Sequence, residues 1–272
     1  CTEHPARSGT LRPMTTRPGA PRGQAYYELD ATRNEYLAFH YPDPRRDPLE
    51  ALLGPRTPPL AERFPYAVAA LVPPRPGGRA LDVGAACGRV TFDLARNHRV
   101  ALGIDLSGAL VSAARDVAAT GRARYAIQQE GEITEELDVP VDTPPNARFA
   151  VADALGLPFA DRAFDTVVAL NLVDRVPDPG RALDELGRVT APRGTLVVGS
   201  PYTWLSEWTP RERWLGGFLR DGRAVRGPES VAARLGAAFR VVRDVRMPFY
   251  IPHHARSGQL GMAQVLVLEK SS

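Results

Sequence analysis

The stretch Leu81-Asp82-Val83-Gly84-Ala85-Ala86-Cys87-Gly88-Arg89-Val90 decides the fold of this chain. Apolar residues from 79 to 83 predict a short buried strand, the glycines mark a tight turn, and residues 91 to 97 predict a helix. A strand, a glycine-bounded turn and a helix form the loop on which parallel α/β folds bind nucleotides. The loop lacks the G-x-G-x-x-G of dinucleotide sites, so an amino acid and a ribose suit it better than two phosphates.

A second predicted strand, residues 100 to 104, ends in Asp105. Parallel strands end at one edge of a sheet, so this carboxylate would lie beside the glycine turn and can accept both hydroxyls of a ribose. The loop and the acid together indicate a nucleoside site. The alternative is that Asp82 and Asp105 only cap the helices that follow.

Composition is that of an ordinary soluble globular protein, with 44% hydrophobic and 24% charged residues over 272 positions, which fits a single α/β domain. No apolar run approaches the length of a membrane span and the start has no hydrophobic signal region, so we expect a cytoplasmic protein without membrane contact. The two cysteines, Cys1 and Cys87, cannot form a disulfide framework, and no Cys/His group has zinc spacing. No metal site is expected.

The net charge of +3 lies entirely in the first 25 residues, which hold four arginines and one glutamate. The rest of the chain carries 30 basic and 30 acidic side chains, so it has no basic bias toward nucleic acid. Residues 1–25 are rich in Pro, Gly, Arg and Thr, which predicts a disordered basic tail. Two alternatives stay open for a chain that opens on Cys1: initiation at Met14, or excision from a longer protein.

Residues 26–272 are expected to form one domain. Residues 26–75 predict a helical N-terminal extension: a helix over 26–40, a Pro-rich connector over 42–59 and a helix over 60–72. Either this extension covers the cofactor site as a lid, or its tyrosines only pack it onto the domain. A helix over 107–120 follows Asp105, and residues 122–145, acidic and then Pro-rich, predict an insertion.

Five further strands complete the predicted sheet, over residues 147–152, 164–170, 194–199, 239–245 and 263–269, with helices over 178–190 and 228–236. The fourth strand, residues 164–170, is almost wholly apolar, as a strand covered on both faces should be. It ends in Asn171-Leu172-Val173-Asp174-Arg175, at the edge where a doubly wound sheet binds its ligands.

These features resemble a class I S-adenosylmethionine (SAM) dependent methyltransferase. The resemblance implies a Rossmann-like, doubly wound α/β sheet of seven strands in the order 3-2-1-4-5-7-6, with the last strand antiparallel. It implies SAM as the cofactor, and the residues assigned to it are Asp82, Gly84, Ala85, Ala86, Gly88, Asp105, Leu106, Asp153, Ala154 and Asn171. The usual loop has a glycine where this chain has Ala86.

The end of the fourth strand argues against nucleic-acid substrates. Amino-methyltransferases of adenine and glutamine carry Asn-Pro-Pro-Tyr or a near relative there, whereas this chain has Asn171-Leu172-Val173-Asp174. Cytosine C5 enzymes need a nucleophilic cysteine after a proline, and the internal cysteine lies in the glycine loop instead. A small-molecule substrate is expected.

Several stretches together resemble the methyltransferase that completes ovothiol biosynthesis, often the C-terminal part of a fusion with an iron-dependent sulfoxide synthase. The resemblance covers nearly everything from Tyr26 to Glu269. The stretches are Tyr26-Tyr27-Glu28, residues 35–41, the loop at 84–89, Glu130-Gly131-Glu132, residues 171–179, Ser200-Pro201-Tyr202-Thr203-Trp204-Leu205, Thr209-Pro210-Arg211-Glu212 and Trp214-Leu215-Gly216-Gly217. That family also has an alanine at the position of Ala86.

The resemblance implies transfer of the SAM methyl group to a ring nitrogen, Nπ, of 5-thiohistidine, and a functional link to an iron-dependent sulfoxide synthase. An amino-acid substrate needs a cation for its carboxylate and an anion for its ammonium. The catalytic candidates are Asn171, Asp174 and Tyr202, and the substrate-binding candidates are Tyr26, Tyr27, Tyr36, Arg175 and Trp204. Arg175 has an alternative role as a partner of Asp178 or Asp184. Selenohistidine as substrate, another small molecule, and a non-catalytic SAM-binding module remain as alternatives.

Overall fold

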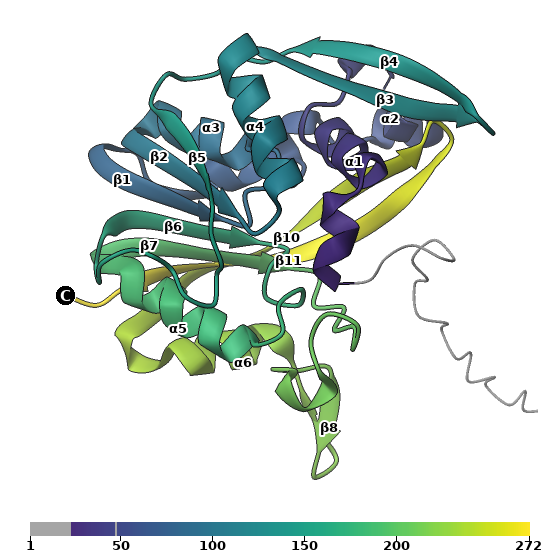
Figure 1. Ribbon diagram of the computed structural model, residues 1–272. Coiled ribbons are helices and arrows are strands. Elements are labelled where there is room, and N and C mark those ends of the chain that lie inside the picture. Colours follow the sequence, from purple (N-terminus) through teal and green to yellow (C-terminus); the bar gives the residue numbers. More distant parts are fainter. Residues whose placement is uncertain (1–22, 47) are drawn as a thin grey trace, which may run out of the picture.

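Seven strands form one mixed sheet at the centre of the computed structural model, which describes residues 23–46 and 48–272 (Figure 1). Across the sheet the order is β5-β2-β1-β6-β7-β11-β10. Counted along the chain within this sheet, the order is 3-2-1-4-5-7-6, and β11 runs antiparallel to both of its neighbours. The predicted fold class is confirmed. The bounds are β1 (Arg75–Val83), β2 (His98–Asp105), β5 (Ala147–Val151), β6 (Phe164–Leu170), β7 (Thr190–Ser200), β10 (Phe239–His254) and β11 (Ser257–Lys270).

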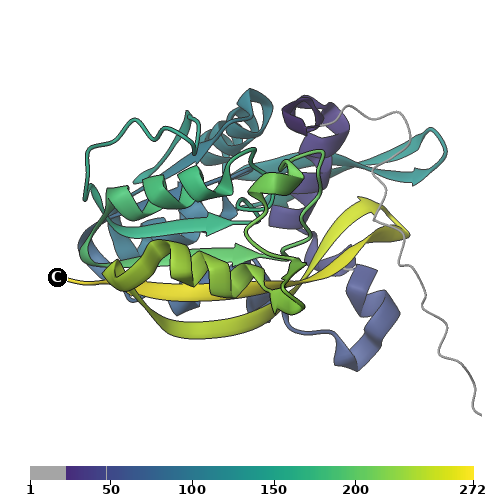
Figure 2. The same cartoon turned by 90° about the horizontal axis from the view of Figure 1, so that it is seen from below.

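Helices cover both faces of the sheet, and each face has its own apolar core. One core holds side chains of α1 (Asp30–His40), α3 (Arg89–Asn97) and α4 (Gly108–Thr120). The other holds side chains of α5 (Pro179–Val189) and α6 (Gly227–Leu235), the green and yellow-green helices of Figure 2. Residues Thr166 to Ala169 of β6 are fully buried because they lie between the two cores.

The N-terminal extension differs from its prediction in detail. The single helix predicted for residues 26–40 is two elements, the 3₁₀ helix η1 (Gly23–Glu28) and α1, with Leu29 between them. Residues 23–25, assigned to the tail, therefore belong to η1, whereas residues 1–22 lie outside the described part of the chain. The predicted connector contains η2 (Pro44–Arg46), α2 (Pro48–Leu53) and η3 (Gly54–Arg56).

The helix predicted over residues 60–72 was wrong in form. Two short 3₁₀ helices, η4 (Leu60–Glu62) and η5 (Tyr66–Leu71), occupy this stretch. Pro65 lies between them, and a proline has no N–H to continue a helical hydrogen-bond ladder. The apolar spacing of the stretch was therefore not enough to specify an α-helix.

Two hairpins project from the sheet. The segment predicted as an insertion forms β3 (Arg122–Glu130) and β4 (Ile133–Pro140), held to the N-terminal extension by a hydrogen bond from the Tyr125 hydroxyl to the carbonyl oxygen of Tyr41 at 2.7 Å. A second, unpredicted hairpin pairs β8 (Phe218–Arg220) with β9 (Arg223–Val225). The short helices η6 (Arg211–Arg213) and η7 (Gly236–Ala238) precede β8 and β10. In the described ranges, no helix has the length and apolar character of a membrane span.

Gly88→Ala should destabilise the fold. Gly88 has φ +88°, and a Cβ atom there would lie 2.6 Å from the ring of Phe149. Left-handed backbone and overpacking together should lower the free energy of unfolding by roughly 2 to 4 kcal/mol, measured by urea denaturation. Gly222→Ala is the matched control, because Gly222 has φ +73° and no atom lies within 4 Å of where its Cβ would stand, so only the backbone contribution of about 1 kcal/mol remains. Equal losses in both variants would contradict the packing argument.

Candidate active site

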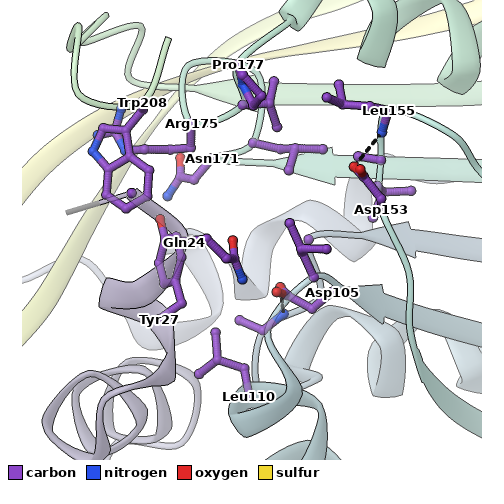
Figure 3. Close-up of a pocket in the computed structure, with 18 of the residues that line it drawn as sticks. Gln24, Tyr27, Asp105, Leu110, Asp153, Leu155, Asn171, Arg175, Pro177 and Trp208 are labelled. Carbon is purple, nitrogen blue, oxygen red and sulfur yellow. Dashed lines mark hydrogen bonds between the residues drawn. The ribbon is translucent and has the colours of Figure 1, made fainter. Parts of the chain in front are cut away.

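A cavity of about 350 Å³ lies at the edge of the sheet where β1, β2, β5 and β6 end (Figure 3). The glycine loop and the strand ends form its floor, and η1, α1 and the loop after β7 close its sides. In Figure 3, Asp105 and Asp153 lie on one side, Tyr27 and Trp208 on the other, and Gln24 between them. The cavity therefore joins segments from the N-terminal extension, the sheet and the loop after β7.

The glycine loop is shaped by hydrogen bonds to the neighbouring strand. The N–H groups of Gly84 and Ala85 both donate to the carbonyl oxygen of Ile104, at 2.8 and 2.9 Å. Gly84 has φ +78° and lines the cavity, where a side chain would meet Leu172 at 3.3 Å. Ala86 also lies in the left-handed region, at φ 45°, which explains why a glycine is usual at this position.

Asp105 accepts a backbone N–H on each carboxylate oxygen. Ala86 donates to Oδ2 at 3.0 Å and Ser107 donates to Oδ1 at 2.9 Å. Burial raises the pKa of this carboxyl group, and the backbone hydrogen bonds act in the opposite direction. Each oxygen keeps a lone pair for a further donor, so the carboxylate can accept the two hydroxyl groups of a ribose.

The other residues around Asp105, at the end of the cavity formed by the glycine loop and the strand ends, also fit SAM. Asp153 accepts the N–H of Leu155 on Oδ1 at 2.8 Å, which leaves Oδ2 for an amino group such as that of adenine. Leu106 and Ala154 add apolar surface to the cavity wall. Asn171 has φ 50°, and its buried Oδ1 has no hydrogen-bond partner among the described residues, so a ligand donor would satisfy it.

Among the described residues, the other end of the cavity is aromatic and holds one cation. Tyr27 contacts Trp208 at 5.2 Å and Tyr36 at 5.8 Å between ring centroids. Burial raises the pKa of both tyrosines, so their hydroxyls stay protonated at neutral pH and can donate hydrogen bonds. Arg175 lines the cavity as well, and its Nη1 donates to Asp174 Oδ2 at 2.8 Å and to the Asp174 carbonyl oxygen at 2.9 Å.

Three residues assigned to the cofactor lie behind the cavity wall. Asp82 is 2% exposed and accepts the Thr91 hydroxyl at 2.7 Å, so it fixes the start of α3 and does not face the ligand. Ala85 and Gly88 are buried and do not line the cavity. They shape the loop through the bond from the Gly88 N–H to the Ala85 carbonyl oxygen at 2.8 Å.

Asp174 is fully buried, and its position corrects the expectation that it faces the substrate. Its Oδ2 accepts from the N–H and the hydroxyl of Thr203, at 3.0 and 2.9 Å, as well as from Arg175. The side chain thus anchors the loop after β7 and orients Arg175. The alternative pairing of Arg175 with Asp178 or Asp184 is not formed, because those two acids pair with Arg213 and Arg234.

Tyr202, Trp204 and Tyr26 do not line this cavity. Tyr202 and Trp204 border a separate groove beside α6 and β11, and Trp204 is 3% exposed and stacked on Trp214 at 6.4 Å. Tyr26 donates its hydroxyl to Glu35 at 3.2 Å and makes an edge-to-face contact with Trp208, and burial raises its pKa to about 12.

Sequence reasoning missed several cavity residues, among them the polar or aromatic side chains of Gln24, Glu207 and Trp208. The clustering of all tryptophans in one loop was the available signal for Trp208, whereas Gln24 sits in a stretch whose composition indicates a tail. In the part of the chain that the structure describes, no three His, Cys, Asp or Glu side chains form a group that can hold a metal ion.

Asp105→Ala should weaken SAM binding while the protein stays folded. Loss of charge-assisted hydrogen bonds to the ribose should cost about 2 to 4 kcal/mol, or roughly 30-fold to 1000-fold in the dissociation constant measured by calorimetry. Asp116→Ala on the exposed face of α4 is the control and should bind SAM as the wild type does. Wild-type affinity in folded Asp105→Ala would remove this residue from the site.

Asp82→Asn should change the pH dependence of stability. Burial raises the pKa of Asp82 from 3.8 to about 7, so between these pH values the folded protein holds a proton that the unfolded chain has released. Stability contributed by this group therefore falls as pH rises through that window and levels off above it. Between about pH 4 and pH 8, the free energy of unfolding of the wild type should fall by roughly 2 to 4 kcal/mol relative to that of Asp82→Asn. Parallel urea-denaturation profiles would contradict the raised pKa.

Comparisons with known proteins point to a methyltransferase. Residues 81–198 match the family model described as a methyltransferase domain. A phosphatidylethanolamine N-methyltransferase of Cereibacter sphaeroides is 36% identical over 123 residues, 45% of this chain and 50% of the relative. A demethylmenaquinone methyltransferase of Beutenbergia cavernae is 32% identical over 146 residues, which make up 54% of this chain and 49% of the relative. The chain thus spans about half the length of these relatives.

A crystal structure of a SAM-dependent methyltransferase from Methanosarcina mazei shares the fold, with a TM-score of 0.51 at 18% identity over 76% of this chain and 98% of that chain. Residues 81–198 therefore match a methyltransferase domain, within a chain that has the fold of the class I SAM-dependent methyltransferases.

Proposed function

We propose that the protein transfers a methyl group from SAM to an imidazole ring nitrogen, Nπ, of 5-thiohistidine. The observation that carries the proposal is the make-up of one cavity, which has the Asp105 carboxylate at one end and the Arg175 guanidinium among aromatic rings at the other. The carboxylate suits the ribose of SAM. The guanidinium suits an α-carboxylate, and the faces of Tyr27 and Trp208 suit a flat ring.

The sequence resemblance to the ovothiol methyltransferases supports the same substrate. The stretches that carry it include Tyr26-Tyr27-Glu28, the 171–179 segment and Ser200–Leu205, and these segments supply or support the substrate end of the cavity. The same resemblance leads us to propose that an iron-dependent sulfoxide synthase supplies the thiolated substrate.

SAM, when bound, supplies a methyl group on a positively charged sulfur to the ring nitrogen. The residues of this chain provide binding and orientation, which account for much of the acceleration in reactions of this type. Arg175 would hold the carboxylate, and the protonated hydroxyl of Tyr27, which interacts with that of Tyr36, would donate a hydrogen bond to the substrate. Asn171 Oδ1 would accept one. Asp174 acts through Arg175 and Thr203 as a positioning residue.

Proton removal from the ring needs only a nearby carboxylate or a water molecule. Tyr27 and Tyr36 are excluded as bases at neutral pH, since burial raises their pKa. Tyr202 is also a poor base, because burial and the nearby charge of Asp174 raise its pKa, and it lies outside the cavity.

Incubation with SAM and separate 5-thiohistidine, selenohistidine and histidine should give a singly methylated product from 5-thiohistidine, detected by mass spectrometry, with the methyl group on Nπ by NMR. Asp105→Ala should lose this product at low SAM concentration. A product from selenohistidine alone would move the assignment to the selenium analogue. SAM binding without a product from any of the three would favour a non-catalytic module or another small-molecule substrate.

A further inference from the structure

One acidic side chain of the cavity has no role in the function described so far. Glu207 lines the cavity beside Trp208 and is half-buried. Among the described residues its carboxylate forms no hydrogen bond or ion pair. The two other acids of the wall, Asp105 and Asp153, lie at the strand ends and accept backbone N–H groups. Glu207 is thus the acid of the cavity that lies outside the cofactor end.

The backbone around Glu207 is held in place. The N–H groups of Trp208 and Thr209 both donate to the carbonyl oxygen of Leu205 at 3.0 Å, which closes a tight turn. The buried hydroxyl of Thr209 donates to the carbonyl oxygen of Val176 at 2.8 Å. Because Val176 directly follows Arg175, this bond fixes the Glu207 turn next to the segment that carries the cation.

An amino-acid substrate brings an ammonium group that needs an anion. Asp174 is not placed to supply it, because the side chain is fully buried and does not line the cavity; its Oδ2 accepts three donors, and its Oδ1, which has no partner among the described residues, lies behind the wall. We propose that Glu207 binds the α-ammonium group of the substrate while Arg175 binds its α-carboxylate. This inference rests on the proposed function and identifies its substrate class as a free, zwitterionic α-amino acid.

Two opposite charges in one cavity would select against related molecules. A histidine within a peptide lacks the free ammonium and carboxylate groups, and a decarboxylated amine lacks the partner of Arg175. Either molecule would leave a partly desolvated charge of the protein unpaired, and such a loss discriminates more strongly than a change in apolar contact. Glu207 is therefore expected to set specificity without contacting the reacting atoms.

The test compares two ligands on two variants. The dissociation constants of 5-thiohistidine and of its analogue without the α-amino group are measured by calorimetry on protein saturated with S-adenosylhomocysteine. Glu207→Gln should weaken 5-thiohistidine binding by about 10-fold to 100-fold and leave the analogue within about 2-fold. Glu212→Gln, an exposed site in the same loop, makes the same charge change and should leave both constants unchanged.

Each outcome decides a different claim. Equal weakening of both ligands in Glu207→Gln would show a structural role and overturn the inference, as would unchanged binding of 5-thiohistidine. Wild-type protein that binds 5-thiohistidine without methylating it would overturn the proposed function alone. Failure of wild-type protein to bind 5-thiohistidine would overturn both.

Discussion

The carboxylate of Asp105 joins two segments that would otherwise be independent. It accepts the N–H of Ala86 in the glycine loop and the N–H of Ser107 at the start of α4. The first bond holds Ala86 in a left-handed conformation that costs a residue with a side chain about 1 kcal/mol. The cofactor end of the cavity therefore depends on one side chain that both shapes the loop and offers its remaining lone pairs to a ligand.

The same junction holds the N-terminal extension. Ser107 donates its hydroxyl to the carbonyl oxygen of Tyr27 at 3.0 Å, and its side chain also caps α4. Glu28 accepts the N–H groups of Gly108 and Ala109 at 3.1 and 3.2 Å. The start of α4 is thus capped by its own N-cap residue, Ser107, and by Glu28 of η1. The favourable interaction of an acid with a helix N-terminus stabilises the docked extension. The cofactor end and the side wall of the cavity are one hydrogen-bonded unit.

Much of the fold follows from local sequence signals, and the site follows only in part. Asp105 and Asp153, which line the cavity, could be predicted because each directly follows a predicted strand, where the direction of the chain fixes the side chain near the sheet edge. The same reasoning failed for Asp174, since the chain has already turned by that residue and Arg175 reaches the cavity instead. Glu207 and Gln24 lie in irregular segments whose position depends on long-range contacts. Pro65 broke a predicted helix in spite of apolar spacing.

The placement of the tryptophans gives the cavity a natural optical reporter. Of the protein's three tryptophans, Trp208 lines the cavity and contacts Tyr27, whereas Trp204 is buried against Trp214. A ligand at the substrate end changes the polarity around one indole and leaves the other two rings in a packed environment. Intrinsic emission can therefore follow occupancy of the substrate end in real time, without a label and without turnover.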